Sequence, residues 1–210
     1  MNKMRRPIES AVLVRHKRIS ALEPIFLQWI NINQEYCNTY VGEDCPYWYN
    51  ERAAISILAG AVWKSGALAL EEFNSNKKYK KSHYSGRADL WFAFDKKRQY
   101  LIEAKYDRFS LSSNSGKMLE KRIAENIDLA FHDAKKSKED ACLLLGVAFI
   151  VPYISPSAQA NEKRMLADFY KLIRNMPNDF LTLYVNPHEM KDEEYGYSYP
   201  CIAIVGDVVS

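Results

Sequence analysis

Two acidic side chains and one lysine lie next to short apolar runs near the middle of the chain. Asp89 precedes the apolar run 90–94, and Glu103 and Lys105 follow a second run at 100–102. Two neighbouring carboxylates repel each other, and the pKa of at least one rises unless a cation or a proton intervenes. Oxygen ligands of this kind suit Mg²⁺ or Mn²⁺ better than zinc. The pattern therefore predicts a divalent-metal site.

The two apolar runs have the length and spacing of a β-hairpin. A short charged segment separates them, and we expect the chain to reverse around Lys96 and Lys97. Because side chains alternate between the two faces of a strand, antiparallel pairing then sets Asp89 opposite residue 103 or 104. In either register the Asp89 carboxylate comes within side-chain reach of Glu103 or lies diagonally near it.

A third carboxylate is expected on the apolar face of a helix. Asn50 is a typical N-cap residue, and the pattern predicts a helix from about Glu51 to Phe73. One face of that helix carries Glu51, Ala54, Ile55, Leu58 and Val62. A carboxylate on a buried stripe is unfavourable without a partner, so Glu51 is a candidate for the same site.

A helical Glu, an Asp that opens a strand and Glu-x-Lys on the adjacent strand, in this order, resemble the PD-(D/E)XK nuclease superfamily. The resemblance covers residues 50–153 and implies a restriction-endonuclease-like α/β fold, with a central mixed β-sheet flanked by helices. Two features depart from the family pattern. Ala88 stands where the family name has Pro, and residues 74–85 are too polar for the strand that usually precedes the Asp strand.

The resemblance implies a metal-dependent nuclease that hydrolyses phosphodiester bonds, with DNA favoured over RNA. Asp89 and Glu103 would bind Mg²⁺ or Mn²⁺ together with the backbone carbonyl of Ala104, and Glu51 would be an auxiliary acid at the metal. Lys105 would orient or activate the attacking water and neutralise charge on the phosphate. A restriction-type enzyme of this kind would most often act as a homodimer.

Two other interpretations of these residues remain open. A nuclease-like fold can lack activity and serve as a nucleic-acid-binding or protein-binding module. Lys105 can also form a buried ion pair with Asp89 or Glu103 that only stabilises the hairpin. The desolvation of buried ion pairs makes them weak stabilisers, which disfavours this second interpretation.

Basic residues gather just before Asp89, interleaved with Tyr79, His83 and Tyr84. This mixture suits phosphate backbones and base stacking, and a solvated lysine-rich loop explains it equally well. The candidate nucleic-acid-binding residues are Lys77, Lys78, Lys80, Lys81 and Arg87. A second basic group closes a later helix and consists of Lys135, Lys136 and Lys138.

The composition is that of a folded protein. The chain has 210 residues, 48% of them hydrophobic and 26% charged, with a net charge of only +3. No apolar run is long enough for a secretory signal or a transmembrane segment, and the four cysteines form no CxxC pair, so a cytoplasmic location is expected. We expect a single domain, with an N-terminal helical elaboration over about 1–46 and a core over about 47–210.

Other segments predict the remaining elements of the sheet and its helices. The long apolar run 141–153 indicates a central strand covered on both faces. Shorter apolar runs predict strands at 11–14, 180–185 and 202–209, and helical spacing predicts helices from about residue 24, over 115–138 and over 161–175. Walker, dinucleotide-binding, serine-hydrolase and HExxH motifs are absent from the sequence.

Overall fold

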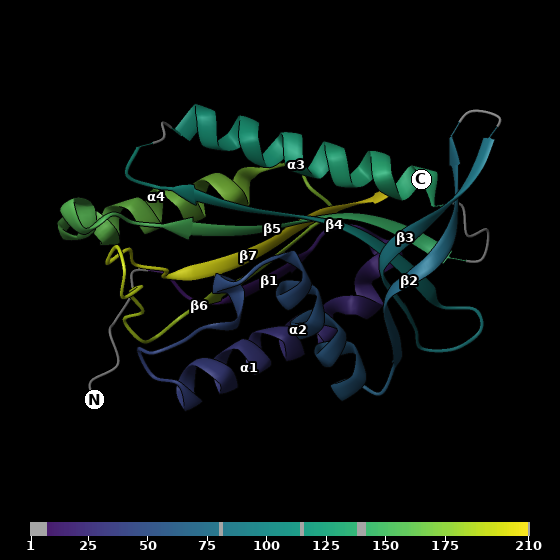
Figure 1. The fold of residues 1–210 in the computed structure, drawn as a ribbon, viewed down its shortest axis with the longest axis horizontal. Helices are drawn as coiled ribbons and strands as arrows, with labels where there is room; N and C mark the ends of the chain where they lie inside the picture. Colours follow the sequence, from purple (N-terminus) through teal and green to yellow (C-terminus); the bar gives the residue numbers. More distant parts are fainter. Residues whose placement is uncertain (1–7, 80–81, 114–115, 138–141, 210) are drawn as a thin grey trace.

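The chain folds around one mixed seven-stranded β-sheet with helices on both faces (Figure 1). The structure is a computed structural model, which describes residues 8–79, 82–113, 116–137 and 142–209. The strand order is β1-β6-β7-β5-β4-β3-β2. The strands are β1 (Ala11–Val14), β2 (Leu68–Tyr79), β3 (Ser82–Ala93), β4 (Gln99–Ser110), β5 (Cys142–Tyr153), β6 (Phe180–Val185) and β7 (Cys201–Val209).

Within the described residues, four α-helices cover the sheet. They are α1 (Glu23–Thr39), α2 (Glu51–Lys64), α3 (Gly116–Lys136) and α4 (Glu162–Asn175). Short 3₁₀ helices join the larger elements; they include η1 (Lys17–Leu22), η2 (Pro46–Trp48) and η3 (Pro156–Asn161). Figure 1 shows α1 and α2 on one face of the sheet and α3 and α4 on the other. The expected α/β class, with a mixed sheet flanked by helices, is therefore confirmed.

The centre of the sheet is the parallel pair β4 and β5, which α3 connects. β4 and β5 pair in parallel along their whole length, from Gln99 opposite Cys142 to Ser110 opposite Tyr153. The other neighbouring strands pair antiparallel. β5 lies between β4 and β7, as its continuous apolar sequence predicts. The strand β1 pairs with β6, so residues 11–14 belong to the same sheet as the rest of the core.

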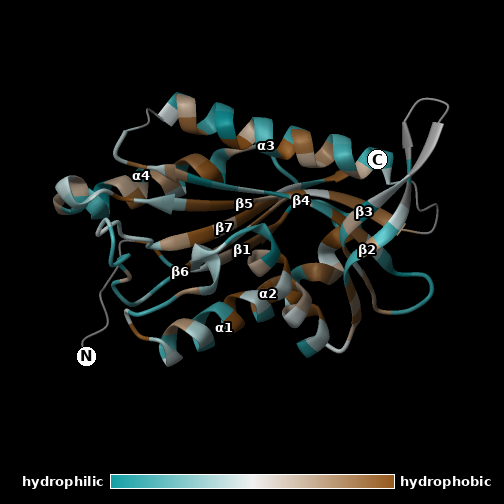
Figure 2. Cartoon of the chain, in the orientation of Figure 1, coloured by the Kyte–Doolittle hydropathy of each residue, from teal (hydrophilic) through white to brown (hydrophobic). Residues whose placement is uncertain are grey.

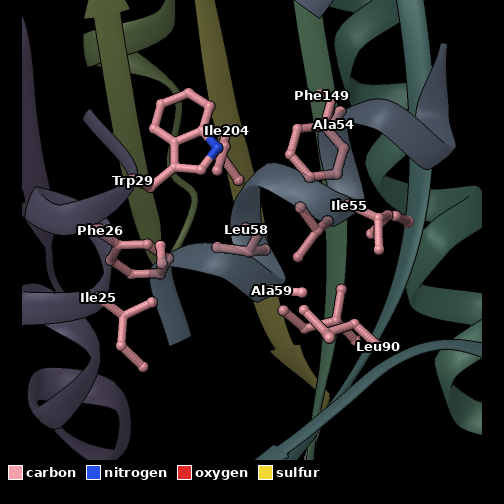
Figure 3. Packing of buried hydrophobic residues seen from close by; sticks show 14 of the residues in the cluster. Ile25, Phe26, Trp29, Ala54, Ile55, Leu58, Ala59, Leu90, Phe149 and Ile204 are labelled. Carbon is pink, nitrogen blue, oxygen red and sulfur yellow. The ribbon is translucent and has the colours of Figure 1, made fainter. Parts of the chain in front are cut away.

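Each face of the sheet has its own apolar core. On the α1 and α2 side, Phe26, Trp29 and Leu58 pack against the sheet residues Phe149 and Ile204 (Figure 3). The opposite core contains the α3 and α4 side chains Ile123, Ile127 and Phe169. Figure 2 shows hydrophobic residues concentrated on the central strands, while α3 alternates between hydrophilic and hydrophobic along its length. Full burial of such a side chain contributes roughly 2 kcal/mol.

A glycine allows α3 to approach the sheet closely. A Cβ atom on Gly146 of β5 would lie 2.5 Å from the backbone nitrogen of Phe131 and 2.6 Å from its Cα, a distance that real Cβ atoms do not adopt. Gly146 is the parallel neighbour of Glu103. Because glycine has no Cβ atom, the α3 backbone can pack directly against the sheet beside Glu103.

The predicted helix over 51–73 is too long. It begins at Glu51 as expected, with the Asn50 side chain accepting a hydrogen bond from the backbone of Ala53 at 3.0 Å. It ends at Lys64, because Gly66 adopts a positive φ of 80° and its backbone N–H donates to the Trp63 carbonyl at 3.0 Å.

The residues that follow form the edge strand β2. β2 pairs antiparallel with β3, from Leu68 opposite Ala93 to Tyr79 opposite Ser82. A strand does precede Asp89, although its sequence is polar. The physical reason is its place in the sheet: β2 has a neighbour on one side only, and its side chains Leu68 and Leu70 are 58% and 55% exposed.

Within the described part of the chain, none of the helices combines the length and apolar character needed to span a bilayer.

Candidate active site

Asp89 lies where β3 and β4 separate. The last pair of their register is Leu90 opposite Ile102, which makes Asp89 the next residue on β3 and Glu103 the next on β4. The predicted register of the hairpin is therefore confirmed. Beyond this point the strands no longer pair, and the Asp89 carboxylate accepts a hydrogen bond from the backbone N–H of Ala104 at 2.7 Å.

The pairing of β3 with β2 is also interrupted at Asp89. Glu71 is paired with Leu90 and Phe73 with Ala88, while the intervening Glu72 is not paired with Asp89. Glu72 has a φ of 46°, which non-glycine residues seldom adopt. The sheet is therefore distorted on both sides of Asp89, and strained backbone is typical of functional sites.

Glu51 reaches the same opening from the N-terminus of α2. Burial raises the pKa of Glu51, and the negative charge of Asp89 adds to the increase. A backbone hydrogen bond from Tyr106 and the charge of Lys105 act in the opposite direction. Asp89 thus accepts a hydrogen bond from Ala104. The backbone of Tyr106, two residues further along β4, lowers the pKa of Glu51.

The packing of α2 explains the position of Glu51. Ala54, Ile55 and Leu58 on the predicted apolar face are all buried, and Figure 3 shows them directed at the sheet near Leu90 and Phe149. Leu90 is the residue that follows Asp89. The same contact that buries the helix therefore fixes its first turn beside the site.

Glu103 is the most deeply buried of the three carboxylates, with an exposed fraction of 3%. One of its oxygens, Oε1, accepts from the Ser137 hydroxyl at 2.6 Å, and the other, Oε2, lies 2.9 Å from Nζ of Lys77. Burial raises the pKa of Glu103, and the charge of Asp89 adds to the increase. Burial also makes the largest contribution to the raised pKa of Asp89.

Lys105 forms an ion pair with Asp133 of α3, in which Nζ and Oδ2 are 2.7 Å apart. Burial favours the neutral amine, but the Asp133 hydrogen bond and the charges of Asp133, Glu51 and Asp89 outweigh it and raise the pKa of Lys105. Lys105 is therefore a cation close to Glu51 and Asp89. The alternative expectation, an ion pair with Asp89 or Glu103, is not what the structure contains, since the partner is Asp133.

The candidate nucleic-acid-binding residues have different environments. Lys77 lies inside the site against Glu103, and Arg87 forms an ion pair with Glu72. Lys80 and Lys81, like the side chain of Lys78, lie outside the described residues. In the second basic group, Lys136 pairs with Asp133 at 2.8 Å and Lys135 Nζ lies 4.4 Å from the centre of the Phe131 ring, while Lys138 lies outside the described residues.

Three residues of the site were not expected from the sequence as members of it. Asp133 of α3 holds Lys105, and Ser137, which directly follows the helix, holds Glu103. Lys77 reaches Glu103 from β2. The spacing of 133 and 137 by one helical turn is a signal in the sequence. This spacing identifies Asp133 and Ser137 as site residues only when the position of α3 relative to β4 is known.

The carboxylates are not arranged around a vacant centre. Among the residues that the structure describes, no group of three or more His, Cys, Asp or Glu side chains is placed to hold a metal ion. Both oxygens of Glu103 have partners, Oε1 in the Ser137 hydroxyl and Oε2 in the Lys77 ammonium.

An aromatic hollow adjoins the site along β4. Two cavities of about 670 and 470 Å³ share the lining residues Trp48, Arg108 and Glu194. Trp48 precedes Glu51 by three residues, and Arg108 follows Lys105 by three. All the other residues that line the two cavities are aromatic or acidic. They are Glu43, Asp44, Tyr49 and Glu193 in the larger cavity, and Tyr153, Asp192, Tyr195, Tyr197 and Tyr199 in the smaller one.

The raised carboxylate pKa values predict how stability depends on pH. A carboxylate whose pKa is higher in the folded protein than in the unfolded chain stabilises the fold at low pH, and this contribution disappears as the pH rises through the raised pKa. The Asp89→Asn variant has no carboxylate to ionise at this position, so it does not lose this contribution to stability as the pH rises. In EDTA, we expect the melting temperature of Asp89→Asn relative to wild type to increase as the pH rises above 3.8, the ordinary pKa of Asp. Thermal unfolding of both proteins across this range tests it, and a constant difference would contradict it.

No family model, curated protein or solved structure matches this chain. The basis for its function is therefore the chemistry of the site described above.

Proposed function

We propose that this chain is a metal-dependent nuclease of the PD-(D/E)XK type, with a restriction-endonuclease-like core. One observation carries the proposal. Glu51, Asp89, Glu103 and Lys105 come from α2, β3 and β4, and the charges of Asp89, Glu103 and Lys105 act on Glu51 near the point where β3 leaves β4. The order of these residues in the chain is the order that the superfamily pattern requires.

The donors at this site suit a hard divalent cation. Burial raises the pKa values of all three carboxylates, and repulsion from a neighbouring carboxylate adds to the increase for Glu51 and Glu103. A nearby positive charge would stabilise the ionised form of each carboxylate. Asp89, Glu103 and the Ala104 carbonyl would hold Mg²⁺ or Mn²⁺, with Glu51 as an auxiliary acid. The metal would supply Lewis-acid stabilisation of the phosphoryl oxygens and a more acidic bound water.

The protein's own residues define the rest of the chemistry. Asp133 holds the Lys105 ammonium 2.7 Å from its carboxylate and keeps it protonated. A fixed ammonium in a partly buried site stabilises the negative charge that builds on the phosphate during phosphodiester hydrolysis. Ser137 fixes the orientation of the Glu103 carboxylate through Oε1.

The direct test is cleavage of nucleic acid. Purified protein is incubated with plasmid DNA, single-stranded DNA or RNA, in Mg²⁺, Mn²⁺ or EDTA, and the products are separated on a denaturing gel. We expect cleavage with either metal and none in EDTA, with DNA cut faster than RNA. Intact nucleic acid under every metal condition would contradict the proposal.

A second candidate function is a binding module without catalysis. The aromatic and acidic hollow around Trp48 and Arg108 favours it, because exposed aromatic rings are typical of binding surfaces. Tyr49 and Tyr195 are 56% and 60% exposed there. Binding of nucleic acid or of a protein that survives substitution of Asp89 and Lys105, without any cutting, would support this function in place of the nuclease.

A further inference from the structure

Lys77 is a partly buried lysine in contact with a proposed metal ligand. Its side chain is 11% exposed, that of Glu103 is 3% exposed, and Nζ lies 2.9 Å from Oε2. Lysine is almost never this buried unless it is paired, because removing its charge from water is unfavourable. Glu103 is the partner that makes its burial possible.

The β2–β3 hairpin is shaped to hold this lysine in place. Ser75 is opposite Gly86 and Lys77 is opposite Tyr84, so the Lys77 stem passes across Gly86. A Cβ atom on Gly86 would lie 2.7 Å from Cδ of Lys77 and 2.9 Å from its Cγ. Any side chain at position 86 would therefore displace the lysine from its present path.

A metal ion can bind Glu103 Oε2 only if this oxygen loses its contact with the Lys77 ammonium. The other oxygen accepts a hydrogen bond from a neutral hydroxyl of Ser137, and such a bond is compatible with a cation nearby. A lysine ammonium is different, because it carries the same sign of charge as a metal ion. At 3 to 4 Å two cations in a partly buried site repel strongly.

We propose that Lys77 is a built-in counter-ion that neutralises Glu103 in the metal-free protein, and that a divalent cation takes its place at Oε2. This inference rests on the proposed function, since it assumes that Glu103 is a metal ligand. Metal binding is then coupled to the position of the Lys77 side chain on the β2–β3 hairpin.

Titration with Mn²⁺ alone, without nucleic acid, tests the proposal. Lys77→Met keeps the aliphatic stem and removes the charge. Isothermal titration calorimetry should give a dissociation constant for Mn²⁺ about tenfold or more below that of wild type, because no ammonium competes for Oε2. Lys96→Met, in the β3–β4 turn, removes an exposed lysine and should leave the affinity unchanged. An unchanged or weaker affinity in Lys77→Met would overturn the proposal.

Gly86→Ala provides a second test that keeps every charge. The added methyl group pushes the Lys77 stem aside, so this variant should also bind Mn²⁺ more tightly than wild type. It covers the case in which Lys77→Met fails to fold, since the buried Glu103 carboxylate then lacks its partner. If Gly86→Ala folds and its affinity equals that of wild type, Lys77 does not compete with the metal.

Glu103→Gln separates failure of this inference from failure of the proposed function. If Glu103→Gln weakens Mn²⁺ binding but Lys77→Met has no effect, the metal site stands and only the counter-ion role is overturned. If Glu103→Gln leaves Mn²⁺ binding unchanged, or if wild type and both hairpin variants bind no Mn²⁺, the metal site and the counter-ion role both fail.

Discussion

Asp89→Asn is expected to reduce metal-dependent cleavage by roughly 10³-fold, the scale of losing one group that stabilises transition-state charge. The asparagine oxygen can still accept the hydrogen bond that Ala104 donates at 2.7 Å, so the strands stay in place. What is lost is the negative charge that would hold the metal. Initial rates of plasmid cleavage in Mg²⁺, with circular dichroism and thermal unfolding to verify the fold, measure the effect.

Two further variants make this result specific. Asp128→Asn changes an exposed aspartate on the outer side of α3 and should cleave at the wild-type rate. Lys105→Met should lose cleavage to a similar extent while it still binds Mn²⁺, because Lys105 acts on the phosphate and not on the metal. Wild-type cleavage by Asp89→Asn would place the activity elsewhere, on another site or another protein.

Gly146→Ala is expected to destabilise the protein by about 2 to 3 kcal/mol, within the range for overpacked cores. The new methyl group would overlap backbone atoms of Phe131, which cannot rotate away as a side chain could. For a chain of this size the loss corresponds to roughly 4 to 12 °C in melting temperature. Cleavage should fall as well, because α3 positions Asp133 and the following Ser137, which hold Lys105 and Glu103.

Gly60→Ala is the matched control for this change. Gly60 lies inside α2, and a Cβ atom there would meet only Cδ1 of Ile32, at an ordinary contact distance of 3.7 Å. Alanine is the better helix former, so the variant should be up to about 1 kcal/mol more stable than wild type. Equal stability of Gly146→Ala and wild type in urea or thermal unfolding would show that α3 can move off the sheet.

The hairpin was predictable because its determinants are local. The charged segment at 95–98 reverses the chain, and the alternation of apolar residues fixes the register, so Asp89 and Glu103 become neighbours. The start of α2 was predictable for the same reason, since the Asn50 cap and the apolar face lie within a few turns of Glu51. The end of α2 was missed, although Gly66 marks it.

Edge position concealed β2 from a reading of its sequence. Strand patterns are recognised by the burial of one or both faces, and β2 has exposed leucines and a polar second half. Its pairing with β3 depends on the partner strand and not on its own composition. This also explains why Lys77 was expected to meet phosphates: without β2, nothing indicates that the side chain turns inward to Glu103.

The residue types in the site and their order come from the chain itself, and with them the prediction of a divalent cation. The partners of those residues are set by tertiary structure. Asp133 and Ser137 meet β4 only because α3 crosses over the sheet between two parallel strands and comes down onto Gly146. Such contacts join residues about 30 positions apart through the packing of a whole helix, and no local pattern specifies them.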